Sequence, residues 1–456
     1  MAFKKNQVIK LEIIDITDLG FGVGRAGGIV VFVSDTVPGD VCEVKIIKVN
    51  STYLVGRVEK FIHRSEKRVD NRCTECQCKS CAYKNLSYKD ECMLKEDGVR
   101  RLFSSVSLTG INTADITPSP AEIRYRNKAQ YPIALIDGKH RVGFFAPKSH
   151  RVTAVSDCPL TPDVFSEICE ELCRYFDEQN VSVYDEVTGL GLLRHVYLRR
   201  GEVSGEVLVT VVINGDTLPN EARLVDTICD KFPTVVGILV NKNTENTNVV
   251  LGAEYRALWG RDHIYDTLSG VRLKITAPSF YQVNHAAAEL LYAKAKELAK
   301  PEKSDTLLDL FCGAGSIGLS MADSVRELIG IEIVDSAVEC ARENAKNSGV
   351  DNAYFFTGDA SETELLLSGA ERELGRKITP DIIILDPPRG GCDERLVKFV
   401  SGLNPKRIVY ISCNPKTLAR DVATFRNLGY NTDTVYPFDL FPCTGHVESV
   451  VCLSRK

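Results

Sequence analysis

Short runs of alternating apolar and polar residues dominate the first 63 residues of the chain. The segments KNQVIKLEIIDIT, GIVVFVSD and YLVGRVEKFI show this alternation, and glycine-rich or Pro-Gly turns separate them. About five short strands joined by tight turns within about 60 residues are typical of a small barrel. The pattern therefore predicts an OB-like β-barrel over residues 1–63.

Helical and strand-like patterns are mixed in the section that follows, residues 64–264. We expect one helix from Tyr88 to about Ser105 and a second helix over 162–178. Strands are expected between and after them, and GEVLVTVVING and VVGILVNKN are the clearest. This mixture indicates a central α+β unit.

The pattern changes again from about residue 265, and we assign 265–456 to a third unit. Apolar runs of five to seven residues now alternate with helical stretches, as in TLLDLF, ELIGIEI, NAYFFTG, DIIILD and RIVYIS. Alternating βα units predict a mostly parallel sheet with right-handed crossovers. The last strand, HVESVVCLS, suits an antiparallel hairpin at the sheet edge. The chain as a whole is therefore expected to be an α/β multidomain protein.

Composition excludes several classes of protein. Hydrophobic residues make up 44% and charged residues 26% of the 456 residues, which are ordinary globular values. No apolar run approaches the roughly 20 residues that a membrane-spanning helix requires. The segment MAFKKNQVIKLE lacks the apolar core of a secretory signal, so we expect a cytoplasmic protein. A formal net charge of -5 excludes a globally basic nucleic-acid binder but not a local basic patch.

Residues 121–152 contain such a patch, with seven basic residues against only Glu122 and Asp137. The basic residues are Arg124, Arg126, Lys128, Lys139, Arg141, Lys148 and Arg151. Aromatic residues lie among them, namely Tyr125, Tyr131, Phe144 and Phe145. Solvated strand faces would also carry such charges, but basic residues beside aromatic rings suit phosphate contact with base stacking. We therefore predict RNA contact here.

The chain has 16 cysteines, and four of them crowd into one short segment: Cys73, Cys76, Cys78 and Cys81. A disulfide framework is not expected in a cytoplasmic chain, whereas metal binding is. All-cysteine zinc sites and iron–sulfur clusters use similar spacings, so the spacing alone leaves both open.

A ligand site is predicted where the first strand of the third unit meets its helix, in LLDLFCGAGSIG. Gly313 and Gly315 let the backbone turn sharply and approach a nucleotide at a helix N-terminus. Glu332 ends the next strand, where a carboxylate can bind ribose hydroxyls. Asp359 and Asp386 follow the third and fourth strands. All lie at the edge where open α/β sheets bind ligands, either a dinucleotide or S-adenosylmethionine (SAM).

Three further segments favour SAM and suggest a reaction. Asp386 opens DPPR, which resembles motif IV of SAM-dependent methyltransferases, but Arg389 replaces the aromatic residue typical of amine-methylating members. Cys413 lies in SCNP after the fifth strand, on the ligand side of the sheet, where a thiolate can act as a nucleophile. Glu448 begins the last strand and can reach the same edge.

Together, DPPRGG, ISCNP and FPCTGHVES resemble the RNA uracil-5 methyltransferases that act on 23S ribosomal RNA and on tRNA. The resemblance covers nearly the whole chain. Residues 1–63 resemble a TRAM domain, an RNA-binding barrel, and YRNK and FYQVN resemble two further family segments. The third unit then resembles a class I SAM methyltransferase domain. Cys443 departs from the family, which commonly has a polar residue such as Gln or His there.

The resemblance implies specific roles. Cys413 would add to C6 of uracil, C5 would take the methyl group from SAM, and Glu448 would remove the C5 proton. SAM contacts would come from Gln282, Phe311, Glu332 and Asp386. The target would be a uridine in structured RNA, and the protein would act as a monomer.

The resemblance also implies a [4Fe–4S] cluster, with zinc as the less favoured metal. Its ligands would be Cys73, Cys78, Cys81 and the distant Cys158, with Cys76 as the alternative first ligand. A cluster favours 23S ribosomal RNA as the substrate over tRNA. Two readings of other classes remain: an iron–sulfur oxidoreductase, which leaves SCNP and HVE unexplained, and a non-catalytic RNA-binding protein.

Overall fold

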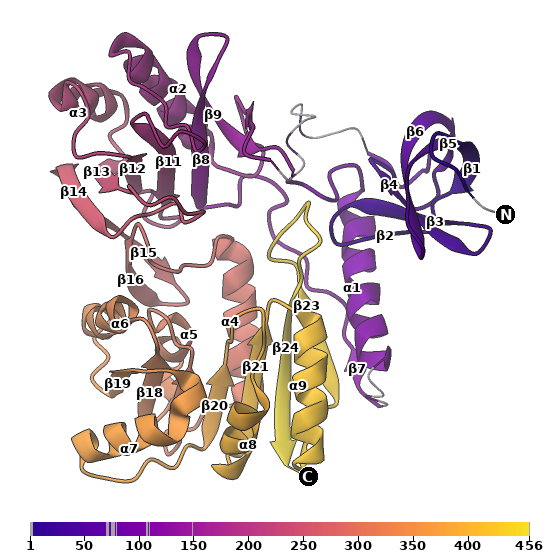
Figure 1. Ribbon diagram of the computed structural model, residues 1–456. Coiled ribbons are helices and arrows are strands. Elements are labelled where there is room, and N and C mark those ends of the chain that lie inside the picture. Colours follow the sequence, from indigo (N-terminus) through magenta and orange to yellow (C-terminus); the bar gives the residue numbers. More distant parts are fainter. Residues whose placement is uncertain are drawn as a thin grey trace.

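The computed structural model describes residues 3–69, 73, 78, 80–105, 108, 110–147 and 149–455. Within these residues the chain forms three large sheets and one two-stranded sheet. Figure 1 shows the first sheet at one side, the second above and the third below, with the two-stranded sheet between the second and third.

The N-terminal sheet is a small barrel whose spatial strand order is β1-β5-β6-β4-β3-β2. The strands are β1 (Val8–Glu12), β2 (Asp15–Ile16), β3 (Phe21–Ala26), β4 (Ile29–Ser34), β5 (Val41–Val49) and β6 (Tyr53–His63). Alternate residues such as Val31, Val33, Val44 and Ile46 fill its core. Gly24 lets β3 approach β1, because a Cβ at this position would lie 2.5 Å from the carbonyl oxygen of Glu12.

The central sheet has seven strands in the order β10-β9-β8-β11-β12-β13-β14. They are β8 (Lys128–Ile136), β9 (Lys139–Phe145), β10 (Val152–Ala154), β11 (Leu193–Arg200), β12 (Val207–Ile213), β13 (Val235–Lys242) and β14 (Glu254–Gly260). Helices α2 (Asp163–Glu178) and α3 (Glu221–Lys231) pack on one face. The small sheet, β15 (His263–Leu268) and β16 (Val271–Thr276), packs with the C-terminal core and with Tyr197 and Leu239 of the central sheet.

The C-terminal sheet has the order β19-β18-β17-β20-β21-β24-β23-β7, and β22 pairs with β24 off this path. Its strands are β7 (Asn112–Thr113), β17 (Thr306–Leu310), β18 (Glu327–Glu332), β19 (Ala353–Thr357), β20 (Ile382–Leu385), β21 (Arg407–Ser412), β22 (Tyr430–Asn431), β23 (Thr434–Phe438) and β24 (Glu448–Arg455). The first five along the path are parallel, as the alternating pattern predicts, and β24 is antiparallel to β21 and β23.

Helices cover both faces of this sheet. One face packs against α4 (His285–Ala299), α5 (Ser316–Leu319) and α6 (Asp335–Asn347). The other face packs against α1 (Tyr88–Ser105), α7 (Thr363–Leu374), α8 (Glu394–Gly402) and α9 (Pro415–Asn427). Two short 3-10 helices, Ala322–Ser324 and Ala360–Glu362, lie in the connections.

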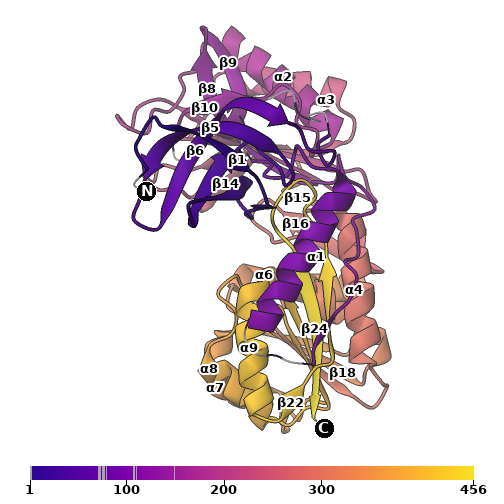
Figure 2. The same cartoon turned by 90° about the vertical axis from the view of Figure 1, so that its right-hand side faces the viewer.

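Two elements from the first third of the chain belong to this C-terminal sheet. Val99 and Phe103 of α1 are buried in its core, and β7 pairs in parallel with β23 at the sheet edge. Figure 2 shows α1 running alongside α9 and β24. The expectation that the last hairpin forms the edge is therefore wrong: β24 lies between β21 and β23, and β7 forms the edge. A strand of two residues leaves no pattern in the sequence.

No helix in the described part of the chain is both long enough and apolar enough to cross a membrane.

Candidate active site

The glycine-rich segment forms a tight turn between β17 and α5. Phe311, Gly313 and Gly315 all have positive φ, at 64°, 53° and 80°. Gly315 is the most restricted, because a Cβ there would also lie 3.1 Å from the ring of Phe355. Glu332 closes the turn from the end of β18, accepting hydrogen bonds from the backbone N–H of Gly313 at 3.0 Å and of Val334 at 3.0 Å. The glycine turn and the carboxylate at the end of β18 are thus joined directly.

Asp309 lies beneath this turn and was not singled out from the sequence. It is 1% exposed, and its Oδ2 accepts a hydrogen bond from the backbone N–H of Gly318 at 3.0 Å. Burial raises the pKa of Asp309 to about 8. An acidic residue inside the apolar strand TLLDL was the signal for it, because a buried carboxyl needs a structural reason.

The strand order gathers the predicted residues along one sheet edge. Parallel strands present their carboxyl ends at the same edge. These ends are followed or formed, from β19 through β18, β17 and β20 to β21, by Asp359, Glu332, Phe311, Asp386 and Cys413. Glu448 starts the antiparallel β24 and reaches the same edge.

Cys413 and Glu448 face each other across two neighbouring strands. The register of β21 and β24 pairs Ser412 with Ser449, so it places Cys413 opposite Glu448. Burial raises the pKa of the Cys413 thiol, and the charges of Glu448 and Asp386 raise it further. Arg389 opposes this shift. A half-buried thiol and a buried carboxyl thus lie at the ends of two neighbouring strands.

Glu448 is a buried carboxyl whose pKa is raised well above its ordinary value. It is 5% exposed, and burial raises its pKa to about 8, with a further rise from Asp386 and an opposing effect from Arg389. Burial also raises the pKa of Asp386 to about 7. His446 lies beside them, with its Nε2 3.4 Å from Nη2 of Arg389, and burial and nearby cations lower its pKa. Arg389 is therefore the cation of the site, a role that the sequence did not indicate.

The Asn414-Pro415 turn fixes the loop that carries Cys413 relative to the loop that carries Arg389. Asn414 caps α9 by accepting a hydrogen bond from the backbone N–H of Lys416 at 3.2 Å, and Pro415 occupies the first turn. The side-chain amide of Asn414 also donates to the carbonyl oxygen of Arg389 at 2.9 Å. The loop that carries the arginine is thereby tied to the loop that carries the thiol.

The FYQVN segment lies next to the YRNK strand. The side-chain amide of Asn127 donates a hydrogen bond to the carbonyl oxygen of Gln282 at 2.8 Å, and its backbone N–H donates one to the carbonyl oxygen of Val283 at 3.0 Å. Gln282 is 8% exposed, while Phe280 two residues earlier is 69% exposed. Asn284 then caps α4 by accepting a hydrogen bond from Ala287. The two segments, 155 residues apart, form one structural joint.

Four of the predicted metal ligands line one cavity of ≈380 Å³: Cys73, Cys78, Cys81 and Cys158. The pKa of the Cys81 thiol is raised, and burial is the largest cause of this rise. Neighbouring thiols raise it further, in decreasing order those of Cys443, Cys158, Cys78 and Cys73. Cys76, the alternative first ligand, lies outside the described residues. Among the residues that the structure describes, no three His, Cys, Asp or Glu side chains are placed so that they could hold a metal ion.

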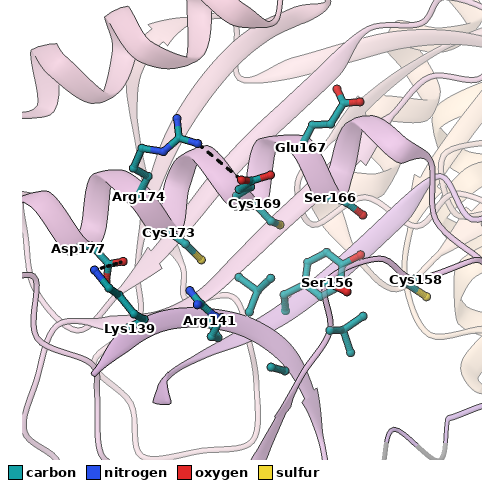
Figure 3. Close-up of a pocket in the computed structure, with 15 residues that line it drawn as sticks. Lys139, Arg141, Ser156, Cys158, Ser166, Glu167, Cys169, Cys173, Arg174 and Asp177 are labelled. Atoms are coloured by element: carbon teal, nitrogen blue, oxygen red, sulfur yellow. Dashed lines mark ion pairs between the residues drawn. The ribbon is translucent and has the colours of Figure 1, made fainter. Parts of the chain in front are cut away.

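A second cavity, of ≈730 Å³, lies between α2 and strands β9 and β10 (Figure 3). Charged residues on its wall pair with each other, as Lys139 does with Asp177 at 3.8 Å. Cys158 lines both this cavity and the cysteine-lined one. Neither cavity includes Cys413 or Glu448.

The basic patch is only partly available for RNA. Arg124 forms ion pairs with Asp157 and Asp163, both at 2.7 Å, and Lys148 lies outside the described residues. The expected stacking role of two tyrosines is wrong, because Tyr125 and Tyr131 are 5% and 3% exposed. Both rings pack in the interior, which the sequence could not distinguish from an exposed aromatic strand face.

The chain matches known proteins along its whole length. Residues 242–456 match the family model described as tRNA (Uracil-5-)-methyltransferase, and residues 2–58 match the TRAM domain model. An uncharacterized RNA methyltransferase of Halalkalibacterium halodurans is 35% identical over 99% of this chain and 98% of its own length. An uncharacterized RNA methyltransferase of Clostridium tetani is 34% identical over 99% of this chain and 97% of its own length. The chain belongs to the RNA uracil-5 methyltransferase family.

A solved structure is similar to this methyltransferase over nearly its whole length. It is the tRNA (uracil-54, C5)-methyltransferase of Pyrococcus abyssi in complex with S-adenosyl-L-homocysteine. The TM-score is 0.78 at 28% identity, covering 98% of this chain and 100% of that one. The predicted TRAM barrel and SAM-dependent methyltransferase fold are thus confirmed. The residue roles and the iron–sulfur cluster stay predictions.

Proposed function

We propose that this methyltransferase transfers the methyl group of SAM to C5 of a uridine in structured RNA through a covalent adduct between Cys413 and C6. The observation that carries the proposal is the placement of Cys413 opposite Glu448, beside Asp386 and Arg389. A thiol facing a buried carboxyl serves an addition that must later be reversed by proton removal.

The residues divide the chemistry as follows. The Cys413 thiolate adds to C6 and makes C5 nucleophilic. C5 then takes the electrophilic methyl group that SAM supplies, with S-adenosyl-L-homocysteine as the leaving group. Glu448, as carboxylate, removes the proton from C5, and the electrons of that C–H bond expel the Cys413 thiolate from C6. General-base help of this kind is typically worth about 10²–10⁴-fold. The target base must leave its stack to reach the pocket, which is least costly in a loop.

The SAM site would be formed by the glycine turn and the carboxylates around it. Glu332 and Asp386 lie on either side of that turn, and Gln282 is held at the joint with Asn127. Gly313 leaves the backbone open to close approach by a ligand, and Phe311 would contact the ligand with its side chain.

We also propose that Cys73, Cys78, Cys81 and Cys158 hold a [4Fe–4S] cluster. The donor chemistry fits, because four thiols line one cavity and a bound metal would stabilise their deprotonated form. The described side chains would have to draw together around the cluster, because no three of them are placed to hold a metal ion. Such a cluster would supply a rigid cross-link between the cysteine loop and the central sheet.

Metal analysis tests this second proposal. Protein purified without oxygen is expected to contain about four iron atoms and matching sulfide per chain, with broad visible absorption. Cys78→Ser should remove the iron and the absorption, whereas Cys229→Ser on α3 should retain both. Zinc in place of iron, or iron retained in Cys78→Ser, would contradict the proposal.

The RNA class has two candidates. The cysteine set resembles that of ribosomal RNA methyltransferases, so we propose 23S ribosomal RNA as the substrate. The likeness to the tRNA (uracil-54, C5)-methyltransferase of Pyrococcus abyssi favours tRNA as the second candidate.

Methyl transfer from radiolabelled SAM to unmodified 23S ribosomal RNA and unmodified tRNA decides between them. Label recovered as 5-methyluridine in ribosomal RNA is the expected result. Label in tRNA alone would support the proposed reaction but contradict ribosomal RNA as its substrate. Label in neither, with SAM bound, would overturn the proposed function for both RNAs.

Replacement of Arg389 should shift the pH dependence of the reaction rate. Glu448 removes the C5 proton only when deprotonated, so the rate of adduct resolution, measured in single turnovers, is expected to rise about tenfold per pH unit below its pKa of about 8 and then level off. Arg389→Met removes the cation that lowers the pKa values of Glu448 and Cys413, so the rising limb should move to higher pH. Arg372→Met, on α7, is the control. A limb that stays in place or moves to lower pH would contradict this assignment.

A further inference from the structure

The turn between β23 and β24 leads directly to Glu448 and is held by four separate parts of the chain. Figure 1 shows this loop, in yellow, rising from the sheet toward the barrel and the central unit. Successive carbonyl groups of Leu440, Phe441, Pro442 and Cys443 each accept a hydrogen bond from a different partner. Those partners are, in the same order, the Asn284 amide at 3.1 Å, Lys95 Nζ at 3.2 Å, the Tyr125 hydroxyl at 3.0 Å and the Tyr83 backbone N–H at 3.0 Å.

Lys95 forms the charged centre of this clamp. Its Nζ lies 2.6 Å from Oε1 of Glu91 and 2.8 Å from Oδ1 of Asp439, and the three side chains are 1%, 2% and 0% exposed. The other oxygen of Glu91 accepts a hydrogen bond from the backbone N–H of Cys443 at 3.1 Å. One helix, α1, thus grips both ends of the turn, at Asp439 and at Cys443.

The conformation of the turn needs this support. Cys443 has φ +67°, a left-handed conformation that non-glycine residues adopt only where the surroundings enforce it. After the turn, Gly445 lies against the barrel, because a Cβ there would lie 2.2 Å from the carbonyl oxygen of Asp18. The hydroxyl oxygen of Thr444 then accepts a hydrogen bond from the backbone N–H of His446 at 3.3 Å, and His446 lies two residues before Glu448. A shift of the turn is therefore transmitted along four residues to the carboxyl.

We propose that Lys95 is a positioning residue for Glu448. Through Glu91 and Asp439 it holds the 439–444 turn, and the turn sets where the Glu448 carboxyl meets C5 of the bound uracil. Lys95 touches neither RNA nor SAM in this role, and it acts on proton removal rather than on thiol addition. This inference rests on the proposed function.

The covalent intermediate distinguishes positioning from a structural role. In single turnovers with substrate RNA, the rate of Cys413–RNA adduct formation and the rate of its resolution are measured separately on denaturing gels. For Lys95→Met we expect formation within about twofold of wild type and resolution slowed about 10- to 100-fold, since small displacements of a catalytic group cost that much. Lys398→Met removes an exposed lysine paired with Glu394 on α8 and should change neither rate.

A second variant is needed because Lys95→Met leaves two buried carboxylates without their cation and lowers the stability of the fold. Tyr125→Phe removes only the hydroxyl that binds Pro442 and is expected to slow resolution several-fold while formation is kept. Parallel loss of both rates, or normal resolution in a folded variant, would overturn the proposal. The Glu448→Gln protein is the reference: if it forms no adduct, the proposed function itself fails, whereas adduct there with normal resolution in both clamp variants refutes only the role of Lys95.

Discussion

Cys413→Ala is expected to abolish methyl transfer, lowering turnover by about 10⁴-fold or more, as removal of a covalent nucleophile does in other enzymes. Alanine cannot add to C6, so C5 stays a poor nucleophile even with SAM and RNA bound. The change removes one half-buried thiol from the end of β21, so folding and SAM binding should be kept. Turnover is measured with radiolabelled SAM, and the absence of any denaturation-stable RNA adduct is checked on the same samples.

Cys229→Ala serves as the matched control, because this cysteine lies on α3, outside the C-terminal sheet. Its turnover should equal that of wild type. Substantial methyl transfer by Cys413→Ala would remove the covalent mechanism and leave the thiol as a packing residue.

Glu448→Gln is expected to have the second large effect and the opposite signature. The amide has the shape of the carboxyl but cannot accept the C5 proton, so methylated RNA should remain attached to Cys413. Turnover should fall about 10²–10⁴-fold while the adduct accumulates. The cost in stability should be small, because Glu448 has a pKa of about 8 and is mostly protonated at pH 7 before substrate binds. Gel shift and mass spectrometry of the trapped species measure the result.

Glu394→Gln, an exposed change on α8, controls for loss of a carboxylate elsewhere. If Glu448→Gln turned over normally, another group would have to remove the proton, and Asp386 would be the first to test. Loss of turnover without adduct would overturn the proposed function.

Local motifs indicated which residues lie at this edge of the sheet, because each of them follows, ends or starts a recognisable strand. Cys413 and Glu448 are separated by only 35 positions in the printed sequence, and the strand pattern alone placed both at the ligand edge. Their mutual register could not be read from the sequence, since it depends on β24 entering the sheet beside β21.

The clamp around Lys95 could not be predicted for a different reason. Lys95 and Asp439 are 344 residues apart, and each alone reads as an ordinary charged surface residue. Only the packing of α1 on the C-terminal sheet buries them together. Asp309 was readable in principle, because a carboxyl in an apolar strand is costly unless it is used.

The placement of α1 and β7 has an evolutionary consequence. The unit built on the C-terminal sheet is discontinuous in sequence: α1 and β7 belong to it together with the elements from α4 onward, and the central sheet is inserted between them in the sequence. The two ends of the insertion are joined, since the Asn284 amide donates to Ser119 Oγ at 2.9 Å. Recognition elements carried on such an insertion can be lengthened or exchanged while the sheet that performs the chemistry stays intact. A fragment begun at residue 242, where the methyltransferase family match starts, would lack α1, one of the helices that cover one face of that sheet.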